Sequence, residues 1–260
     1  MRRSAHVEGR CHLCGTVGPL TFEHVPPSTA FNDCRVLEAD IHRLIGSDLT
    51  EELKHPKGKY NQRGAGSYTL CASCNSKTGS WYANAYISLV KKMYNLPFRL
   101  GSFECALVYV NCKPLNLLKQ ILTMFCSACP PDFPLRNPSV VRYLLNQYSG
   151  DFPYDIEIYL SLFDSRNSRA TRQSGITGRS ELGGESHIYS EISFPPFNLL
   201  MSLNSPPPDE RLFDVTWFRN YALGEDADVR LILHNLPVNT YFPADYRGTE
   251  ELRSKNNDAT

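Results

Sequence analysis

The sequence predicts an α+β protein with a zinc-stapled domain at its N-terminus, followed by a β-rich domain of mixed α/β character. Three observations support this prediction: two Cys-x-x-Cys pairs within the first 74 residues, a helical pattern directly after the second pair, and several alternating apolar runs beyond residue 100. The chain has 260 residues. Because domains of about 100–150 residues are typical, we expect two of them, residues 1–99 and 100–260.

The composition, 42% hydrophobic and 21% charged, is typical of a soluble globular protein. No stretch approaches the roughly 18–20 consecutive apolar residues of a membrane span, so no membrane partner is expected. Residues 1–15 are basic and polar and lack the apolar core of a secretory signal. We therefore expect a cytoplasmic location, where paired cysteines bind metal more often than they form disulfides.

Four cysteines are the predicted ligands of a structural zinc ion. Cys11 and Cys14 form one pair, with Gly15 allowing a tight turn after them, and Cys71 and Cys74 form the other. Zinc favours four thiolate or imidazole ligands in a tetrahedron, and each Cys-x-x-Cys turn can supply two of them. The chain between the pairs can loop out freely.

The other cysteines have a plainer interpretation. Cys126 and Cys129 end an apolar helix pattern, where residues three apart share one face, so core packing is favoured over a second metal site. We interpret the remaining three as structural: Cys34, Cys105 and Cys112.

Between the cysteine pairs the sequence predicts two short strands and a long insertion. Leu20–Val25 is the first strand, stopped by two prolines, and Ser67–Leu70 is the second. Within the insertion, residues 28–66, a helix is predicted at Val36–Leu44. After Cys74 a further helix is expected, ended by Pro97. Its apolar face follows helical spacing and consists of Tyr82, Ala85, Tyr86, Leu89, Val90 and Met93.

The second domain begins with a β-like run and two helices. The run is Phe103–Val110, Pro114 starts one helix, and Pro138 starts another that continues to about Gln147. Tyr154–Phe163 alternates between apolar and other residues, which predicts a strand.

The rest of the chain is expected to be a mobile loop and further strands. Asp164–Ser186 is rich in Ser, Gly, Thr and Arg, and we predict a solvated loop in preference to a phosphate-binding one. The β-like runs that follow it are Ile188–Phe194, Val215–Phe218 and Val229–Leu233.

The charge distribution indicates a nucleic-acid partner. The net charge is zero, yet residues 53–103 contain eight Lys or Arg and no Asp or Glu. A basic stretch of this kind is the usual electrostatic footprint of phosphate contact, although a solvated basic face is the alternative. The predicted nucleic-acid-binding residues are Lys54, Lys57, Lys59, Arg63 and Lys77.

The residues around the cysteine pairs resemble the HNH endonucleases, which have a ββα-metal fold stapled by zinc. The run Cys-x-x-Cys-Gly, then Glu-His-Val-Pro-Pro, then Leu-Cys-x-x-Cys-Asn carries the resemblance, over roughly residues 10–92. The resemblance implies a ββα unit made of the two predicted strands and the following helix.

The resemblance also implies three catalytic residues. His24 corresponds to the general base that activates water for attack on a phosphodiester. Glu23 and Asn75 correspond to the ligands of a catalytic divalent metal, Mg²⁺ or Mn²⁺. Such a hard cation prefers carboxylate and amide oxygens and can stabilise the charge that develops during hydrolysis. The alternatives are that His24 packs beside the zinc or ligates it, and that Asn75 is a helix cap.

The sequence departs from the family pattern at one point. The family has an Asn a few residues before the second cysteine pair, which braces the hairpin, whereas residues 66–70 here read Gly-Ser-Tyr-Thr-Leu. Asn61 is the nearest Asn upstream, and the insertion is long for this hairpin.

The leading hypothesis is a metal-dependent HNH-type endonuclease that hydrolyses nucleic acid, with DNA favoured over RNA and bacterial defence suggested by analogy. One alternative is a non-catalytic, zinc-stapled nucleic-acid-binding module. Another is a zinc-stabilised protein-interaction adaptor. Residues 100–260 carry an excess of negative charge, which suits a regulatory, dimerising or partner-binding role, with a homodimer or a regulatory protein as the partner.

Overall fold

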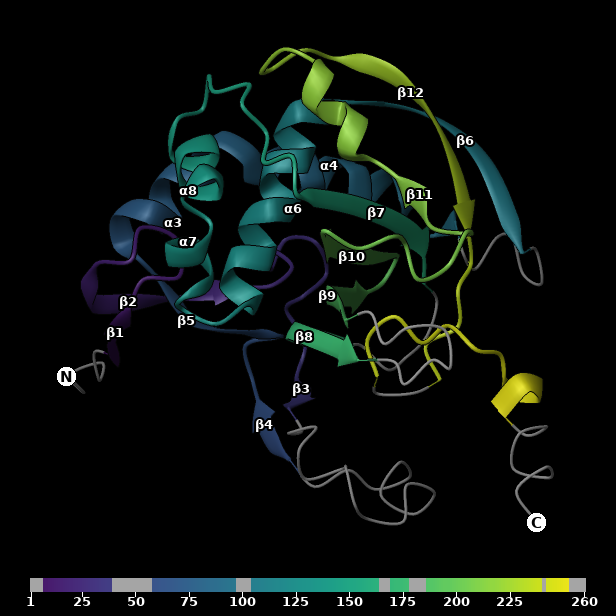
Figure 1. Ribbon diagram of the computed structural model, residues 1–260, viewed down its shortest axis with the longest axis horizontal. Helices are drawn as coiled ribbons and strands as arrows, with labels where there is room; N and C mark the ends of the chain where they lie inside the picture. The colour runs from purple at the N-terminus through teal and green to yellow at the C-terminus, as the bar shows by residue number, and fades with distance from the viewer. Residues whose placement is uncertain are drawn as a thin grey trace.

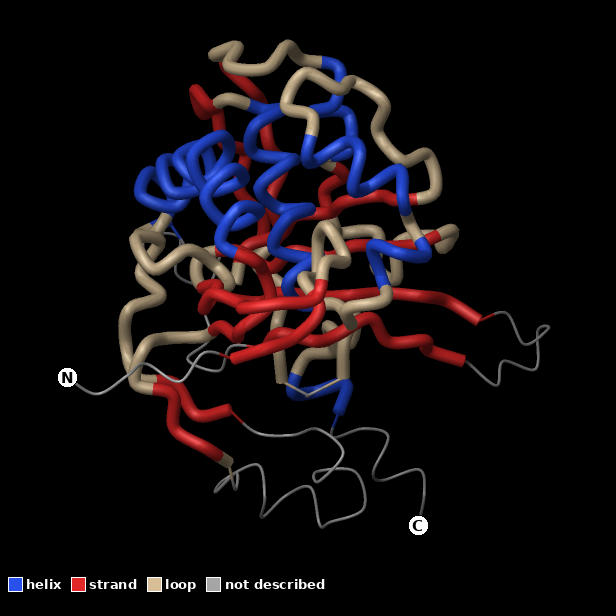
Figure 2. The backbone as a smooth tube through the Cα atoms, turned by 90° about the vertical axis from the view of Figure 1, so that its left-hand side faces the viewer, coloured by secondary structure: helices blue, strands red, loops and turns tan. Residues whose placement is uncertain are grey.

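The computed structural model describes residues 7–38, 58–96, 104–163, 169–177, 186–239 and 242–252. The chain forms a mixed α/β structure with several sheets and a group of helices (Figure 1). Seen from the side, the helices gather above the larger sheet (Figure 2). None of the described helices is long and apolar enough to cross a membrane.

The N-terminal part contains a three-stranded antiparallel sheet followed by a helix. β1 (Val7–Arg10), β2 (Val17–His24) and β5 (Gly66–Cys71) are hydrogen-bonded in that order. α3 (Ala72–Thr78) begins directly after β5. Both predicted strands and the predicted helix are therefore confirmed, and β2, β5 and α3 form a ββα unit.

The helix after the second cysteine pair has a π-helical turn in its middle. α3 passes into this turn, η1 (Gly79–Ala83), and then into α4 (Asn84–Met93). The predicted apolar positions of α4 are buried, because α4 packs against α6 (Pro114–Ala128), the central helix of the protein. α3 instead contacts β2 and β5.

The insertion between β2 and β5 contains a β-hairpin-like pair in place of the predicted helix. β3 (Val36–Glu38) pairs antiparallel with β4 (Lys59–Asn61). The prediction of a helix at Val36–Leu44 is therefore wrong for residues 36–38, where cross-strand pairing decides the backbone conformation. Residues 39–44 lie outside the described residues.

The C-terminal part is built on a five-stranded antiparallel sheet in the order β11-β7-β10-β9-β8. A separate two-stranded sheet joins β6 to β12. The bounds of these strands are β6 Cys105–Cys112, β7 Ile156–Leu162, β8 Arg169–Thr177, β9 Ser186–Phe194, β10 Phe197–Leu203, β11 Phe213–Asp214 and β12 Ala227–His234. The runs expected at Phe103–Val110, Tyr154–Phe163, Ile188–Phe194 and Val229–Leu233 are confirmed as strands within the described residues.

Two expectations in this part are wrong. Residues 169–177 of the predicted mobile loop form β8, which pairs with β9 at the edge of the sheet. Backbone hydrogen bonds to β9 suffice for an edge strand, so its polar sequence does not prevent pairing. The predicted strand at Val215–Phe218 is a short 3₁₀ helix, η2 (Thr216–Asn220). The Asp214 carboxylate starts it by accepting the Thr216 N–H at 2.7 Å.

The core runs through both halves of the chain. α6 (Pro114–Ala128) lies at the centre, and every residue of it except Ala128 is buried. α7 (Phe133–Arg136) and α8 (Pro138–Leu145) follow it. One continuous apolar cluster includes residues from both sides of residue 99, for example Cys11, Leu70, Phe125, Leu199 and Leu231. The division into domains 1–99 and 100–260 stays a prediction.

A charged side chain lies inside this core. Lys119, in the middle of α6, is fully buried. Its ammonium group donates to four backbone carbonyls at or just beyond the end of α8, those of Tyr143, Asn146, Gln147 and Ser149, at 2.9–3.2 Å. The ammonium group also lies 4.1 Å from the centre of the Tyr143 ring. Burial lowers the pKa of Lys119 to about 8, so the group is still charged at neutral pH.

Candidate functional site

The four cysteines of the two pairs come together in space. Their sulfur atoms all lie within 4.8 Å of one another. The Sγ atoms of Cys14 and Cys71 are 3.8 Å apart, which agrees with the separation of about 3.8 Å in a tetrahedral site with Zn–S bonds of about 2.3 Å. Four cysteines in this arrangement could hold a metal ion such as zinc. Within the described ranges, no other group of three or more His, Cys, Asp or Glu side chains could do so.

Backbone hydrogen bonds hold the first cysteine turn in the shape that a metal needs. The Gly15 N–H donates to the Cys11 carbonyl at 3.0 Å, and Gly15 has a φ of 75°, which a glycine adopts without strain. The Cys71 N–H donates to Cys11 Sγ at 3.3 Å, an interaction that stabilises a thiolate. The His12 N–H donates to the Thr69 carbonyl at 2.8 Å and ties this turn to β5.

The electrostatics of the four-cysteine cluster favour a cation. A hydrogen bond from Cys74 lowers the pKa of Cys11 to about 4, and the same contact raises the pKa of Cys74 above its usual value. Burial raises the pKa of Cys71. Four adjacent sulfurs cannot all ionise without a compensating positive charge, and metal binding supplies that charge as it displaces the protons.

Cys126 and Cys129 take no part in this cluster. Both are buried at the end of α6, and burial raises the pKa of Cys126 well above its usual value. Cys129 Sγ lies 3.8 Å from the Ser190 hydroxyl. The pair is therefore part of the core, in agreement with its interpretation from the sequence.

Glu23 lies near the end of β2 and is half-buried. Burial raises the pKa of its carboxyl group to about 7, and among the described residues no neighbouring charge or hydrogen bond contributes to the shift. Burying a carboxylate without a compensating partner is unfavourable, so this position suits either a neutral acid or the ligand of a cation.

Asn75, on α3, contacts β2 through Thr21. Its Nδ2 atom donates to Thr21 Oγ1 at 2.9 Å, and the Thr21 hydroxyl donates in turn to the Leu70 carbonyl at 2.8 Å. The register of the β2–β5 pair shifts between Thr21 and Phe22, so simple alternation along β2 does not carry the orientation of Thr21 over to Glu23. The N-cap of α3 is Cys71, so the alternative interpretation of Asn75 as the helix cap is wrong.

His24 is held on the other face of β2. Its Nε2 atom is 2.8 Å from the Arg63 carbonyl oxygen. Its ring makes an edge contact with Phe22, at 4.9 Å between ring centres, which places both rings on one face of the strand. His24 is not among the four side chains of the metal cluster. The three predicted catalytic residues therefore belong to one ββα unit, but Glu23 and His24 leave β2 on opposite faces.

Asn32 is the residue that sequence reasoning missed. It is fully buried, and its Nδ2 atom donates to the Pro26 carbonyl at 2.6 Å and to the Ala65 carbonyl at 2.7 Å. Its Oδ1 atom accepts the Ala65 N–H at 2.6 Å. Asn32 thus braces the two ends of the insertion beside His24, the task expected of the missing Asn before the second cysteine pair. The Phe31-Asn32-Asp33 sequence carries no signal of this role.

Gly64 makes this brace possible. Its φ is 91°, a conformation that favours glycine, and a Cβ atom there would overlap with the Asn32 carbonyl oxygen. The close approach of Gly64 to Asn32 positions the neighbouring Arg63 carbonyl that holds His24.

We expect Asn32→Ala to weaken the brace in two ways. It removes the partner of the Pro26 carbonyl and of the Ala65 N–H, at a cost of about 2–3 kcal/mol of unfolding free energy, whereas the Ala65 carbonyl still accepts the Val25 N–H. It also frees the Arg63 carbonyl to move, so the His24 imidazole resonances should shift in NMR spectra. Asn239→Ala, which removes an exposed hydrogen bond to the Arg247 carbonyl, is the matched control. Equal stability and equal His24 resonances in the two variants would contradict the role of Asn32.

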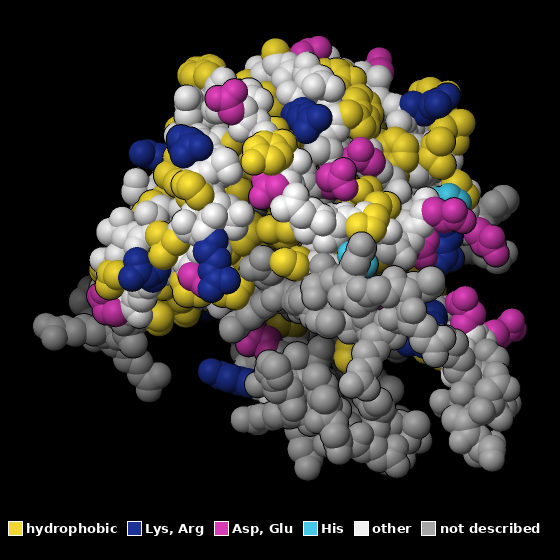
Figure 3. Space-filling model, in the orientation of Figure 1, with side chains coloured by type: hydrophobic (Ala, Val, Ile, Leu, Met, Phe, Trp, Pro, Cys, Tyr) yellow, Lys and Arg dark blue, Asp and Glu magenta, His cyan; other side chains and the backbone are white. Residues whose placement is uncertain are grey.

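The predicted nucleic-acid-binding residues are only partly placed. Three of them are described and exposed: Lys59 on β4, Arg63 between β4 and β5, and Lys77 on α3. Lys54 and Lys57 lie outside the described residues. On the face drawn in Figure 3, the basic and acidic side chains of the described residues are interspersed and form no continuous basic patch.

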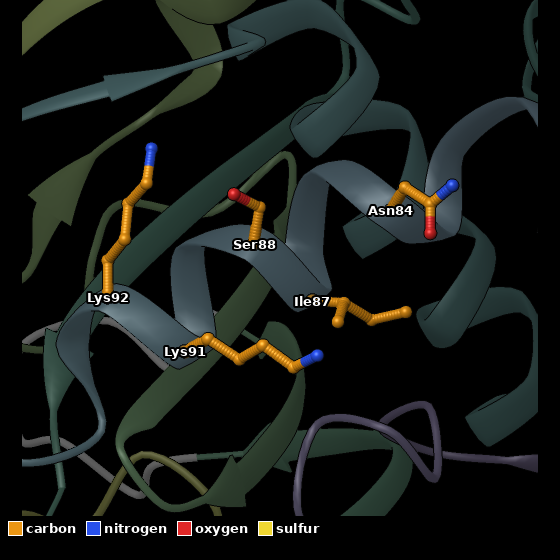
Figure 4. A pocket seen from close by; sticks show the side chains of 5 residues that line it. All are labelled: Asn84, Ile87, Ser88, Lys91 and Lys92. Carbon is orange, nitrogen blue, oxygen red and sulfur yellow. The ribbon is translucent and has the colours of Figure 1, made fainter.

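A shallow hollow of about 450 Å³ lies on the outer face of α4. Its lining residues are Asn84, Ile87, Ser88, Lys91 and Lys92 (Figure 4). The ammonium groups of the two lysines point in different directions, and Lys92 donates to the Asn111 carbonyl at 2.6 Å. The hollow therefore does not focus two positive charges on one anion.

No protein-family model, no curated protein and no solved structure matches this chain. Its function is therefore inferred from its own residues.

Proposed function

We propose that this chain is a metal-dependent endonuclease of the HNH type that hydrolyses phosphodiester bonds of nucleic acid, with DNA favoured over RNA. The observation that carries the proposal is the 2.8 Å hydrogen bond between His24 Nε2 and the Arg63 carbonyl. A carbonyl oxygen can only accept, so Nε2 carries the hydrogen and Nδ1 is the basic nitrogen of the neutral ring. A histidine fixed in one tautomer by a backbone carbonyl is well suited to act as a general base.

His24 would take the proton of the attacking water at Nδ1. The imidazolium that forms keeps its hydrogen bond to the Arg63 carbonyl, whose partial negative charge stabilises the new positive charge. Because Glu23 and His24 leave opposite faces of β2, the scissile phosphate must bind over the end of the strand, where both side chains can reach it.

Glu23 and Asn75 would hold the catalytic divalent cation, Mg²⁺ or Mn²⁺. The donor set fits a hard cation: a carboxyl group whose burial disfavours an uncompensated charge, and an amide whose nitrogen is already bonded to Thr21. The bound cation would supply charge stabilisation for the phosphorane-like transition state and the leaving oxygen. The Lys77 ammonium, exposed on the same helix as Asn75, would contact a phosphate.

The four-cysteine cluster would bind a structural zinc ion and take no part in the reaction. It joins the first cysteine turn to the start of α3, so it fixes the position of Asn75 relative to β2. A closed site with four thiolate ligands has no open position for water, which is the mark of a structural zinc.

The test is cleavage of supercoiled plasmid and of single-stranded circular DNA with Mg²⁺ or Mn²⁺. The wild type should cut, and His24→Ala should lose at least about 100-fold in rate, the lower end of general-base contributions. His234→Ala, on β12, is the matched control and should cut like the wild type. Zinc content and melting temperature should be equal in all three proteins. Cleavage by His24→Ala at the wild-type rate would refute the assignment of His24.

The second candidate is a zinc-stapled nucleic-acid-binding module without catalysis. The opposite orientation of Glu23 and His24 on β2 favours it. Such a module would bind nucleic acid with a strong salt dependence and leave plasmid intact under every metal condition. That result for the wild type would replace the nuclease by the binding module.

Glu23 should make stability depend on pH. Its pKa is about 7 in the folded protein against an ordinary 4.5, so folding favours the neutral form. Its contribution to stability is complete below pH 4.5 and is lost as the pH rises through about 7. Between about pH 4.5 and pH 8, with zinc as the only metal, the wild type should lose up to about 3 kcal/mol of unfolding free energy relative to Glu23→Gln.

Urea unfolding of both proteins across this pH range measures the difference. At the alkaline end, Mg²⁺ or Mn²⁺ should restore the unfolding free energy of the wild type. The same ions should leave the unfolding free energy of Glu23→Gln unchanged, because only the carboxylate attracts the cation. Parallel stability curves for the two proteins would show that Glu23 is not a desolvated acid.

A further inference from the structure

Exposed aromatic rings lie on the same face of β2 as His24. Phe22 contacts the His24 ring, and Tyr68 on β5 contacts Phe22 with 5.4 Å between ring centres. Tyr68 remains 37% exposed. The Arg63 guanidinium lies 5.8 Å from the centre of the Phe22 ring. The proposed base is therefore part of a row of rings and not an isolated side chain.

A second exposed ring lies on the β3–β4 pair. Tyr60 is 53% exposed, and the Arg35 guanidinium covers one face of its ring at 3.5 Å from the ring centre. The guanidinium covers one face of the ring, and about half of the Tyr60 surface stays accessible to solvent. The β3–β4 pair projects from the body of the protein in both views (Figures 1 and 2).

Tyr60 is close along the chain to the residue that holds His24. It lies three positions before Arg63, whose carbonyl holds the His24 ring. Three residues span at most about 11 Å, which is roughly three stacked nucleotides at about 3.4 Å each. A base on Tyr60 and a phosphate at His24 can therefore belong to one short stretch of a single strand.

The described charged side chains around these rings are few and of both signs. The described charged side chains of β3, β4 and their flanks are Arg35, Lys59 and Arg63, against Asp33 and Glu38. Proteins that bind duplex DNA neutralise many phosphates. Proteins that bind single strands gain much of their affinity from aromatic rings, on which any base can stack, and from arginine beside those rings.

We propose that Tyr60 and Tyr68 stack unpaired bases next to the phosphodiester at His24, so that the substrate is single-stranded nucleic acid. This inference rests on the proposed function. Arg35 braces the Tyr60 ring from behind and adds positive charge to it. The tyrosines hold the strand, and His24 acts on the phosphate that follows.

The test is binding of a labelled 20-nucleotide single strand and of the same sequence as a duplex, by fluorescence anisotropy with the zinc-loaded full chain and no Mg²⁺ or Mn²⁺. The wild type should bind the single strand more tightly. Tyr60→Ala should weaken single-strand binding about 10-fold, since stacking contributes about 1–3 kcal/mol per base. Tyr60→Phe should keep the affinity. Tyr154→Ala, which removes another exposed tyrosine, is the matched control.

Salt dependence separates stacking from charge. Tyr60→Ala should leave the slope of log affinity against log salt unchanged, whereas Lys59→Gln should reduce it. Unchanged single-strand binding by Tyr60→Ala, or an equal loss for the duplex, overturns the inference. Cleavage that depends on His24 but not on Tyr60 overturns the inference and leaves the proposed nuclease standing. No binding to either nucleic acid overturns both.

Discussion

Cys71→Ser is expected to lose the bound zinc and to melt more than about 10 °C below the wild type. Structural zinc sites contribute apparent binding free energies of about 10–16 kcal/mol, most of which acts as folding free energy. A zinc ion held by Cys14 and Cys71 also closes a loop between residues 57 apart. A covalent crosslink over that span would contribute about 4 kcal/mol by restricting the unfolded chain.

Metal analysis of the purified protein and thermal unfolding followed by circular dichroism test this expectation. The wild type should carry one zinc per chain, and a strong chelator should lower its melting temperature to that of Cys71→Ser. Cys105→Ser, at an exposed cysteine on β6, is the matched control and should behave like the wild type. Retention of stoichiometric zinc by Cys71→Ser would show that Cys71 is not a ligand.

The second large effect is expected from Lys119→Met. Methionine fills a similar volume, but it removes the ammonium donor from all four carbonyls. The Asn146 carbonyl keeps a donor, because it also accepts the Ser149 N–H at 3.0 Å. A buried carbonyl left without a donor costs about 1–3 kcal/mol, so the loss of several such contacts is expected to cost about 4 kcal/mol. For a chain of this length, about 4 kcal/mol corresponds to roughly 10 °C in melting temperature.

Lys91→Met provides the matched comparison, because Lys91 is exposed on α4. Its stability should stay within about 0.5 kcal/mol of the wild type. Lys119→Arg should also be destabilised, since a planar guanidinium cannot take the place of an ammonium group among four converging carbonyls. Equal melting of Lys119→Met and Lys91→Met would mean that the carbonyls find other donors or water.

Spacing and periodicity predicted the parts of the fold that depend on local chemistry. The two Cys-x-x-Cys pairs come together as their spacing indicates, and α6 begins at Pro114 as predicted. β8 escaped prediction because an edge strand needs a neighbour to pair with, not apolar side chains. A neighbour of this kind is invisible in the local sequence.

The candidate site was predictable only in part, for the same reason. Glu23, His24 and Asn75 all fall within the ββα unit, but motif spacing alone does not show that a strand points the first two apart. The partners of Asn32 are six residues and 33 residues away along the chain. Lys119 lies within an apolar helix pattern, which gives no reason for a charged residue. Its reason is the position of the carbonyls at and beyond the end of α8, which only the folded structure shows.

The π-helical turn at Gly79–Ala83 keeps one face of a long helix aligned. The buried residues Cys74, Thr78, Tyr82, Tyr86 and Val90 recur every four positions. In a regular α-helix each such step rotates the row by about 40°, so the row would wind around the helix. A π turn holds one residue more than an α turn, and this extra residue reverses about 100° of the rotation that the row has accumulated.

The π turn therefore corrects the rotation of α3 relative to α4 about their common helix axis. It lets the cysteine at one end face the metal cluster while the apolar residues at the other end still face α6. Adding or deleting a single residue between Asn75 and Tyr82 would swing one end out of alignment by about 100°. The length of this helix is consequently as tightly constrained as the identity of the residues it carries.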